Sequence, residues 1–337
     1  MKKRKRIYRA VMASICLVIL ILDTKTAIAG ATKGIDLCLR SIIPSLFPFC
    51  LLTKLICSSL LGKRIPFVQR IGRLTGIPVG AESILLLGFI GGYPIGAQCI
   101  DDAYQTGTIS GSDAARMLAF CNNVGPAFLF GILGVLFPKA LPLWGLYIIH
   151  ILSAVIVGIV LPKKSVDVCT LQSKAALTLP QSLESSIRTM ASICGWIIVF
   201  KIILQFADRW FLWALDPAGQ ATVAGLLEMS NGCISLINVQ NLGLRYILCS
   251  LFLGFGGCCV GMQTAAVARH IDFKLYFPGK VLQALLSILL AMLTQHFIFP
   301  TQDVYHINGL SSLFLTIGAI ISIIILCKKK KVVAIAK

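Results

Sequence analysis

The sequence has few charged residues and lacks the short motifs that mark many enzymes and metal sites. Asp, Glu, Lys and Arg make up 13% of its 337 residues, about half of their share in an ordinary soluble domain. It contains no C-x-x-C, no His-x-x-His, no P-loop and no Ser/His/Asp arrangement. These absences exclude a soluble globular protein and predict a chain with no metal ion, no cofactor, no ATP-driven transport of its own and no enzymatic activity.

Long apolar runs are what the sequence has instead. Hydrophobic residues account for 57% of the chain, and several runs of about 17 to 25 residues are long enough to cross a bilayer as helices. We therefore predict an all-α polytopic membrane protein with about 8–10 hydrophobic helices, some of them discontinuous or re-entrant. The apolar segments lie near residues 7–25, 38–61, 83–104, 116–137, 141–161, 187–207, 209–228, 245–268, 279–299 and 309–327.

Positive charge is concentrated at the two ends of the chain. The formal net charge is +18, but 11 basic residues lie at 2–9 and 328–337, and 20 basic residues against 13 acidic ones remain elsewhere. Basic clusters beside membrane helices mark the cytoplasmic side. We therefore expect both termini to be cytoplasmic, and we expect no nucleic-acid partner.

The first 30 residues allow two interpretations. A basic stretch, an apolar segment at 11–22 and the triplet Ala27-Ile28-Ala29 together resemble a signal peptide. An uncleaved transmembrane helix is favoured, because the rest of the chain is itself apolar enough to lie in the membrane.

Two basic, turn-rich connectors, at 62–80 and 162–182, separate the apolar segments. If both connectors are cytoplasmic, one of the three segments between 83 and 161 has to enter and leave the membrane on the same side. The predicted units are an N-terminal transmembrane helix at 1–30, a first repeat at 31–161, the connector at 162–182, a second repeat at 183–300, and a C-terminal transmembrane helix with a basic tail at 301–337.

Glycine and proline interrupt an apolar segment of the first half. The letters GFIGGYPIGAQ at 88–98 include Gly91, Gly92, Tyr93, Pro94 and Gly96. In a helix, each Gly costs about 1 kcal/mol and Pro about 3 kcal/mol, and backbone freed by a break must be buried in protein or line a wet cavity. Close helix packing through small residues is the alternative, but Pro94 favours a helix break.

A similar segment, GFGGCCVGMQ, occurs at 254–263 in the second half and includes Gly256, Gly257 and Gly261. It matches the first segment after one deletion, so we predict a duplicated unit. An acidic and a basic residue spaced i, i+4 precede each segment, namely Asp36/Arg40 and Glu184/Arg188. Paired interruptions in two halves point to the binding site of a transporter near the membrane midplane.

Adjacent amides interrupt another apolar run, where Asn122 and Asn123 are followed by Gly125 and Pro126. Polar groups inside a membrane usually face a cavity or a partner helix. Two roles stay open: hydrogen bonding to a substrate, and repair of backbone groups that Pro126 frees.

Further polar residues lie near the interruptions. Glu228 and Asn231 follow an apolar segment of the second half, and Glu228 is either a carboxylate whose protonation is coupled to movement or an interfacial residue near a helix end. Gln98 and Gln263 each close a glycine segment.

Four other charged residues receive ordinary explanations from the sequence. Lys54 and Lys201 lie within apolar segments, where long basic side chains can reach the interface by snorkelling. Asp101 and Asp102 come after the first glycine segment and are expected at a solvated exit.

Several motifs in this order resemble a known family. PSLFPF at 44–49, GFIGGYPIGAQ at 88–98 and AFCNNVGPAF at 119–128 resemble the sporulation integral membrane proteins of the YlbJ (SpoVV) type. SSIRTM at 185–190 and the following GFGGCCVGMQ resemble the nucleoside-recognition, or Gate, domain. The resemblance covers roughly residues 35–300 and implies two Gate-type repeats, which we expect to be inverted.

The resemblance also implies a function. A protein of this type is expected to transport a small organic anion, dipicolinate, across the outer forespore membrane, with the lipid bilayer and a homo-oligomer or other sporulation membrane proteins as partners. The alternatives are a nucleoside permease and a non-transporting scaffold or morphogenetic factor for spore maturation. The residues expected to bind substrate or gate its passage are Gly91, Gly92, Tyr93, Pro94, Gly96, Gln98, Asn122, Asn123, Gly125, Pro126, Glu228, Asn231, Gly256, Gly257, Gly261 and Gln263.

Overall fold

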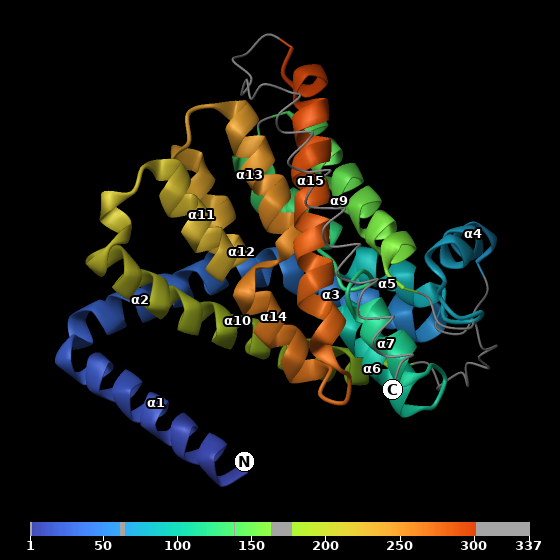
Figure 1. Cartoon of the computed structure of the whole chain (residues 1–337), viewed down its shortest axis with the longest axis horizontal. Coiled ribbons are helices and arrows are strands. Elements are labelled where there is room, and N and C mark those ends of the chain that lie inside the picture. Colours follow the sequence, from blue (N-terminus) through green and yellow to red (C-terminus); the bar gives the residue numbers. More distant parts are fainter. Residues whose placement is uncertain (1, 61–64, 138, 163–176, 301–337) are drawn as a thin grey trace, which may run out of the picture.

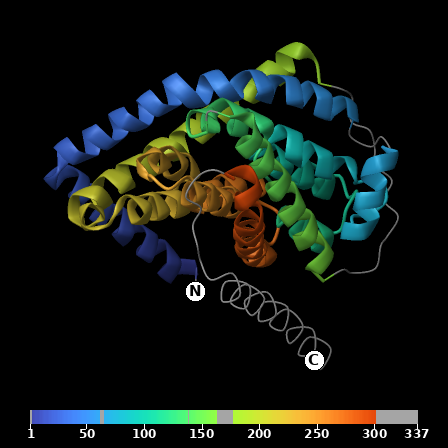
Figure 2. The same cartoon turned by 90° about the horizontal axis from the view of Figure 1, so that it is seen from above.

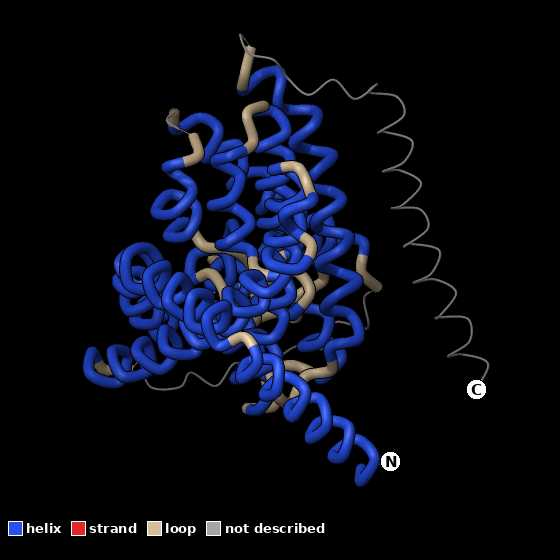
Figure 3. The backbone as a smooth tube through the Cα atoms, turned by 90° about the vertical axis from the view of Figure 1, so that its left-hand side faces the viewer, coloured by secondary structure: helices blue, strands red, loops and turns tan. Residues whose placement is uncertain are grey.

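The computed structural model describes residues 2–60, 65–137, 139–162 and 177–300, and helices are the only regular structure in these ranges (Figure 3). Five helical stretches there are long and apolar enough to cross a membrane. They are Thr24–Ile56, Ala140–Val160, Leu179–Trp210, Leu242–Val267 and Phe273–Ile298. The prediction of an all-α polytopic membrane protein is confirmed. The predicted helix and tail at 301–337 and most of the connector at 162–182 lie outside the described residues.

The helices fall into two series (Figure 1). After α1 (Lys2–Leu22), the first series is α2 (Thr24–Leu37), a π-helical turn (Cys38–Ile42), α3 (Ile43–Leu60), α4 (Pro66–Thr75), α5 (Ser83–Gly91), α6 (Ile95–Gln105), α7 (Gly111–Leu118), α8 (Pro126–Ile132) and α9 (Ala140–Val160). The second series is α10 (Leu179–Trp210), α11 (Pro217–Leu227), α12 (Met229–Ser235), α13 (Leu242–Phe255), α14 (Gly257–Val267) and α15 (Tyr276–Ile298). The predicted boundary at residue 30 falls inside α2, because the chain turns at Asp23 instead.

Each half contains a hairpin of two short helices. In the second half, Gly232 of α12 comes back against Gly225 of α11, and a Cβ at Gly232 would collide with the Gly225 backbone. In the first half, Gly88 of α5 and Gly96 of α6 both lie against the carbonyl oxygen of Cys121. Such approaches require the chain to turn back on itself between the two helices. The expected segment that enters and leaves on one side is therefore the α5–α6 hairpin.

Each half also contains a helix that is broken in the middle. The α7–α8 path is unwound from Ala119 to Gly125, and the α13–α14 path is interrupted at Gly256, whose φ is +83°. Both halves consequently run in the same order: a long helix, a hairpin, a broken helix and a second long helix.

Equivalent long helices of the two halves lie side by side and antiparallel. Gly30 of α2 faces Ile202 of α10, and Gly34 faces Ile198, so the numbers rise on one helix as they fall on the other. The α9–α15 pair behaves in the same way, since its contacts run from Gly145 with Ile298 to Ser153 with Ser287. Antiparallel equivalents agree with the expectation of inverted repeats.

The long helices of the two pairs run at a steep angle to each other. Figure 1 shows α2 and α10 crossing the molecule below α13, α15 and α9, and Figure 2 shows α2 and α3 as one long path along an edge.

The two glycine segments are not structural equivalents, so the duplication predicted from them is wrong in register. The first segment forms the tip of the α5–α6 hairpin, whereas the second forms the break of the α13–α14 path. By element order, the equivalent of the first tip is Glu228, and the equivalent of Gly256 is the unwound stretch at 119–125. The same letters recur because both places require tight backbone approach and positive φ.

Arg116 fixes the base of the first broken helix. Its buried guanidinium donates to the carbonyl oxygens of Thr75 at 2.6 Å and Gly158 at 3.3 Å, and also to that of Gly76. These carbonyls belong to the C-terminal ends of α4 and α9, where the helix dipole favours a cation.

The close α2–α10 contact predicts opposite effects for two glycine substitutions. A Cβ at Gly30 would lie 2.8 Å from the Ile202 Cα, whereas a Cβ at Gly195 of α10 would meet nothing within 4 Å. Both changes to Ala gain about 1 kcal/mol of helix propensity, but Gly30→Ala also forces the helices apart, which costs about 1–3 kcal/mol. We expect a lower apparent melting temperature of the purified protein for Gly30→Ala and an equal or higher one for Gly195→Ala. Equal shifts in both variants would show that this contact does not hold the helices together.

Candidate functional site

The two glycine segments meet although they are not equivalent. A Cβ built on Gly256 would lie 3.0 Å from the Tyr93 hydroxyl oxygen, so the first hairpin tip touches the break of the second half. Gly257 lies as close to the other tip, since its Cβ would be 3.2 Å from the Met229 amide nitrogen. Both hairpin tips therefore converge on the break at Gly256.

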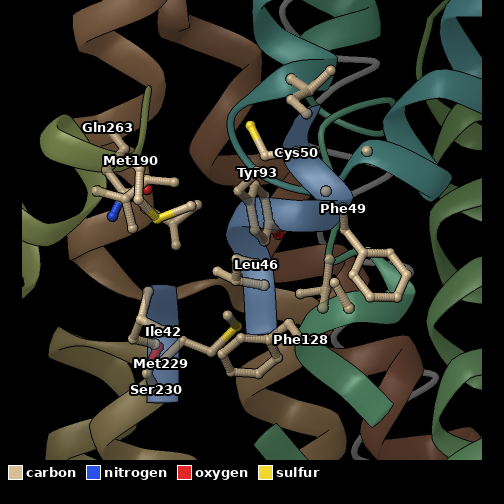
Figure 4. Close-up of a pocket in the computed structure, with 18 of the residues that line it drawn as sticks. Ile42, Leu46, Phe49, Cys50, Tyr93, Phe128, Met190, Met229, Ser230 and Gln263 are labelled. Carbon is tan, nitrogen blue, oxygen red and sulfur yellow. The ribbon is translucent and has the colours of Figure 1, made fainter. Parts of the chain in front are cut away.

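A cavity of about 60 Å³ opens between these tips. Its walls come from α3, α5, α8, α10, α12 and α14 and are mostly apolar, and Figure 4 shows Leu46, Phe128 and Met190 projecting into it. The polar side chains in the lining belong to Tyr93, Glu228, Ser230 and Gln263. Of the predicted site residues, the cavity brings together Gly91, Gly92, Tyr93, Gly125, Glu228 and Gln263.

The first hairpin tip rests on the unwound part of the broken helix in its own half. A Cβ at Gly92 would lie 2.9 Å from the Gly125 amide nitrogen, and Gly92 has a φ of +73°. The chain is thus broken at this segment and also packed through its glycines, so both interpretations of the sequence hold together. Pro94 caps the start of α6 and Pro126 is the first residue of α8, positions at which proline sacrifices no helical hydrogen bond.

Asn122 and Asn123 bond free backbone groups at the start of α6 and in the unwound stretch. The Asn122 carboxamide oxygen accepts from the Ala97 amide at 3.2 Å, and its nitrogen donates to the Thr264 hydroxyl at 2.9 Å. The Asn123 nitrogen donates to the Phe120 carbonyl at 2.6 Å. Both side chains are fully buried and neither lines the cavity. Of the two roles left open by the sequence, this arrangement favours backbone repair.

Glu228 forms the tip of the second hairpin. Its carboxylate accepts from the Ser230 amide at 3.1 Å and from the backbone and side-chain nitrogens of Asn231, both at 2.7 Å. The Lys201 ammonium in turn donates to the Asn231 carboxamide oxygen at 2.6 Å. Glu228 is 2% exposed, so it is a buried helix cap beside the cavity. Lys201 itself is partly buried.

The structure buries two further charged residues. Lys54 is buried and donates to Ser185 and Thr189, so its ammonium is held inside the protein. Asp101 is 6% exposed and bonds Gln105 and His270, so it is not a solvated residue, although Asp102 is exposed. The helix takes Asp101 inward because the two neighbours occupy different faces of α6.

The remaining predicted residues lie away from the cavity lining. Gln98 makes a long 3.5 Å hydrogen bond to Thr189, and Gly261 packs against Phe277. Gly96 accommodates the Cys121 carbonyl.

Lys280 is the polar residue that our sequence reasoning missed. It lies on α15, is fully buried, and donates to the Tyr93 hydroxyl at 3.2 Å and to the Asn122 carbonyl at 2.6 Å. The criterion that singled out Lys54 and Lys201, a lysine within an apolar segment, applies less clearly to Lys280, which lies at the start of the segment 279–299.

Comparison with known proteins gives one informative match. The chain is similar to the sporulation integral membrane protein YlbJ of Bacillus subtilis (strain 168), with 24% identity over 319 residues, which cover 78% of this chain and 76% of YlbJ. This similarity confirms the resemblance to YlbJ-type proteins that the motifs indicated. No protein-family model matches the chain, and no solved structure matches it, so Gate-domain membership stays a prediction.

The hydrogen bonds of Asn122 predict that its loss destabilises the fold. Asn122→Ala leaves the buried Ala97 amide without its acceptor, which costs about 1–3 kcal/mol. We expect a clearly lower apparent melting temperature for this variant than for Gln98→Ala, which removes another predicted site amide with only the 3.5 Å contact. Similar melting temperatures for the two variants would contradict a repair role for Asn122.

Proposed function

We propose that the chain is a secondary transporter or channel-like permease that moves a small organic anion, dipicolinate, across the outer forespore membrane during sporulation. The observation that carries this proposal is the convergence of two hairpin tips and a broken helix on one cavity. Irregular backbone at such a depth is tolerated where it is buried or lines a cavity, and transporters place their substrates at discontinuous helices of this kind. The similarity to YlbJ, a sporulation integral membrane protein, supports the cellular setting.

The charges around the cavity support an anionic substrate. The Glu228 carboxylate is occupied by the amides at the start of α12, so a helix N-terminus compensates its charge. The Lys280 ammonium stands behind Tyr93 with oxygen partners that are uncharged. The apolar walls and the Tyr93 ring suit a planar aromatic acid.

The size of the cavity requires movement during transport. A volume of about 60 Å³ accommodates about four to six water-sized spheres, which is too little for a pyridine dicarboxylate. Glycines with positive φ at Gly92 and Gly256 provide places where a tip and a broken helix can swing apart.

A nucleoside permease is the second candidate, and one observation favours it. Glu228, Ser230 and Gln263 all line the cavity, and acceptors and donors of this kind suit the hydroxyls and ring nitrogens of a neutral solute. If nucleosides compete with dipicolinate for uptake, this candidate gains over the first.

Flux through reconstituted vesicles tests the proposal. The full chain should give saturable dipicolinate uptake, and Gly92→Ala should reduce it by at least about tenfold, because a Cβ there meets the Gly125 backbone and the φ is unfavourable for Ala. Gly107→Ala is the matched control, since Gly107 also has a positive φ of 71° but has open space around it.

Absence of saturable flux for dipicolinate and for nucleosides in the unmodified protein would instead favour the scaffold or morphogenetic role. Equal flux in Gly92→Ala and the unmodified protein would show that the hairpin tip at Gly92 does not take part in transport.

A further inference from the structure

Lys280 is a fully buried lysine whose hydrogen-bond partners are all uncharged. Besides Tyr93 and the Asn122 carbonyl, its ammonium donates to the side-chain oxygens of Asn123 at 3.3 Å and Gln283 at 3.0 Å. Its exposed fraction is 0%. Within the described residues, no carboxylate forms an ion pair with it. Neutral oxygens solvate an ammonium in place of water, but they do not cancel its charge.

Arg116 and Glu228 are two buried charges that helix ends compensate. Arg116 lies at the C-terminal ends of α4 and α9, and Glu228 at the N-terminal end of α12, so each meets a helix end of opposite sign. Lys280 instead lies within the first turns of α15, near the N-terminus of that helix, where the helix dipole does not favour a cation. A negative charge nearby would therefore stabilise it.

Tyr93 connects this charge to the cavity. Its hydroxyl oxygen accepts from the Lys280 ammonium, and the same ammonium lies 5.2 Å from the centre of the Tyr93 ring. The Tyr93 side chain lines the cavity, as Figure 4 shows. A hydroxyl that accepts from a cation becomes a stronger donor, because hydrogen bonds in a chain polarise one another. The phenol proton is thus available to an acceptor other than Lys280.

We infer that Lys280, acting through the Tyr93 hydroxyl, is the specificity-determining residue that makes this cavity prefer a carboxylate over a neutral ligand of the same shape. The ligand class is a planar aromatic carboxylate, whose negative charge lies across the Tyr93 ring from the buried ammonium. Lys280 does not touch the ligand. It places a positive charge behind Tyr93 and orients the Tyr93 hydroxyl, which does touch the ligand. This inference rests on the proposed function, since it concerns the same cavity.

The test compares two pyridines that differ in charge but little in shape. The affinities of the purified full chain for dipicolinate and for uncharged pyridine-2,6-dicarboxamide are measured by calorimetry, and their ratio is the readout. In Lys280→Met we expect the preference for dipicolinate to fall by at least about tenfold, as for loss of a close charge, with the affinity for the diamide unchanged within about twofold. If Lys280 had a purely structural role, Lys280→Met would lower the affinities for both ligands alike and leave their ratio unchanged.

Lys201→Met is the matched control. Lys201 also donates to an asparagine carboxamide oxygen, at 2.6 Å, but it lies behind Glu228 and not behind Tyr93. We expect this variant to keep the ratio of the unmodified protein. A loss of preference in Lys201→Met equal to that in Lys280→Met would overturn the assignment.

Tyr93→Phe tests whether Lys280 acts through the Tyr93 hydroxyl. It also keeps the inference testable if Lys280→Met does not fold. This change removes one oxygen and keeps the ammonium, and it should lower the preference for dipicolinate in the same direction. Where both variants fold, their effects should be less than additive in the double variant, because they act through one contact. An unchanged ratio in Tyr93→Phe overturns the inference.

The failure of this inference differs from the failure of the proposed function. If the unmodified protein binds neither pyridine, the dipicolinate proposal falls and the inference falls with it. If the unmodified protein prefers dipicolinate and Lys280→Met keeps that preference, the inference alone is overturned.

Discussion

Backbone groups freed at helix breaks inside a membrane must find partners within the protein, and this constraint shapes the centre of the molecule. At the start of α6 in the first hairpin, the Ala97 amide donates to the Asn122 side chain. In the unwound stretch before α8, the Val124 amide has no acceptor within a helix and donates to the His150 side chain of α9 at 3.0 Å. The second hairpin supplies its own acceptor in Glu228. The polar residues in the core of the protein are thus mainly those that make broken helices tolerable.

These repairs also join the halves of the chain. Asn122 bonds Thr264 of α14, and Gln283 of α15 bonds Asn123 at 3.1 Å. Contacts of this kind connect the break in one half with helices of the other half. Because Asn122 also accepts from the Ala97 amide of α6, the first hairpin is tied through the break to the helices of the second half.

The sequence predicted the kinds of element in the fold, but not which segments of the two halves correspond or which distant residues meet. Gly92 and Pro94 predicted a break because glycine and proline act locally on the backbone, and the break lies there. Asn122 bonds Thr264 and Lys280 bonds the Asn122 carbonyl, each more than 100 residues away, so no local pattern reveals these contacts. The same limit explains why we expected Asp101 to be solvated and Lys54 to snorkel. The burial of both residues depends on helices from the other half.

The misplaced correspondence between the glycine segments has an evolutionary consequence. One segment turns a hairpin and the other interrupts a crossing helix, so their shared letters do not mark equivalent positions of the two halves. In both places backbones approach one another too closely for a side chain, and this constraint alone accounts for the shared glycines. Traces of an ancient gene duplication should instead be sought by aligning the α5–α6 hairpin with the α11–α12 hairpin, where the letters differ and the architecture agrees.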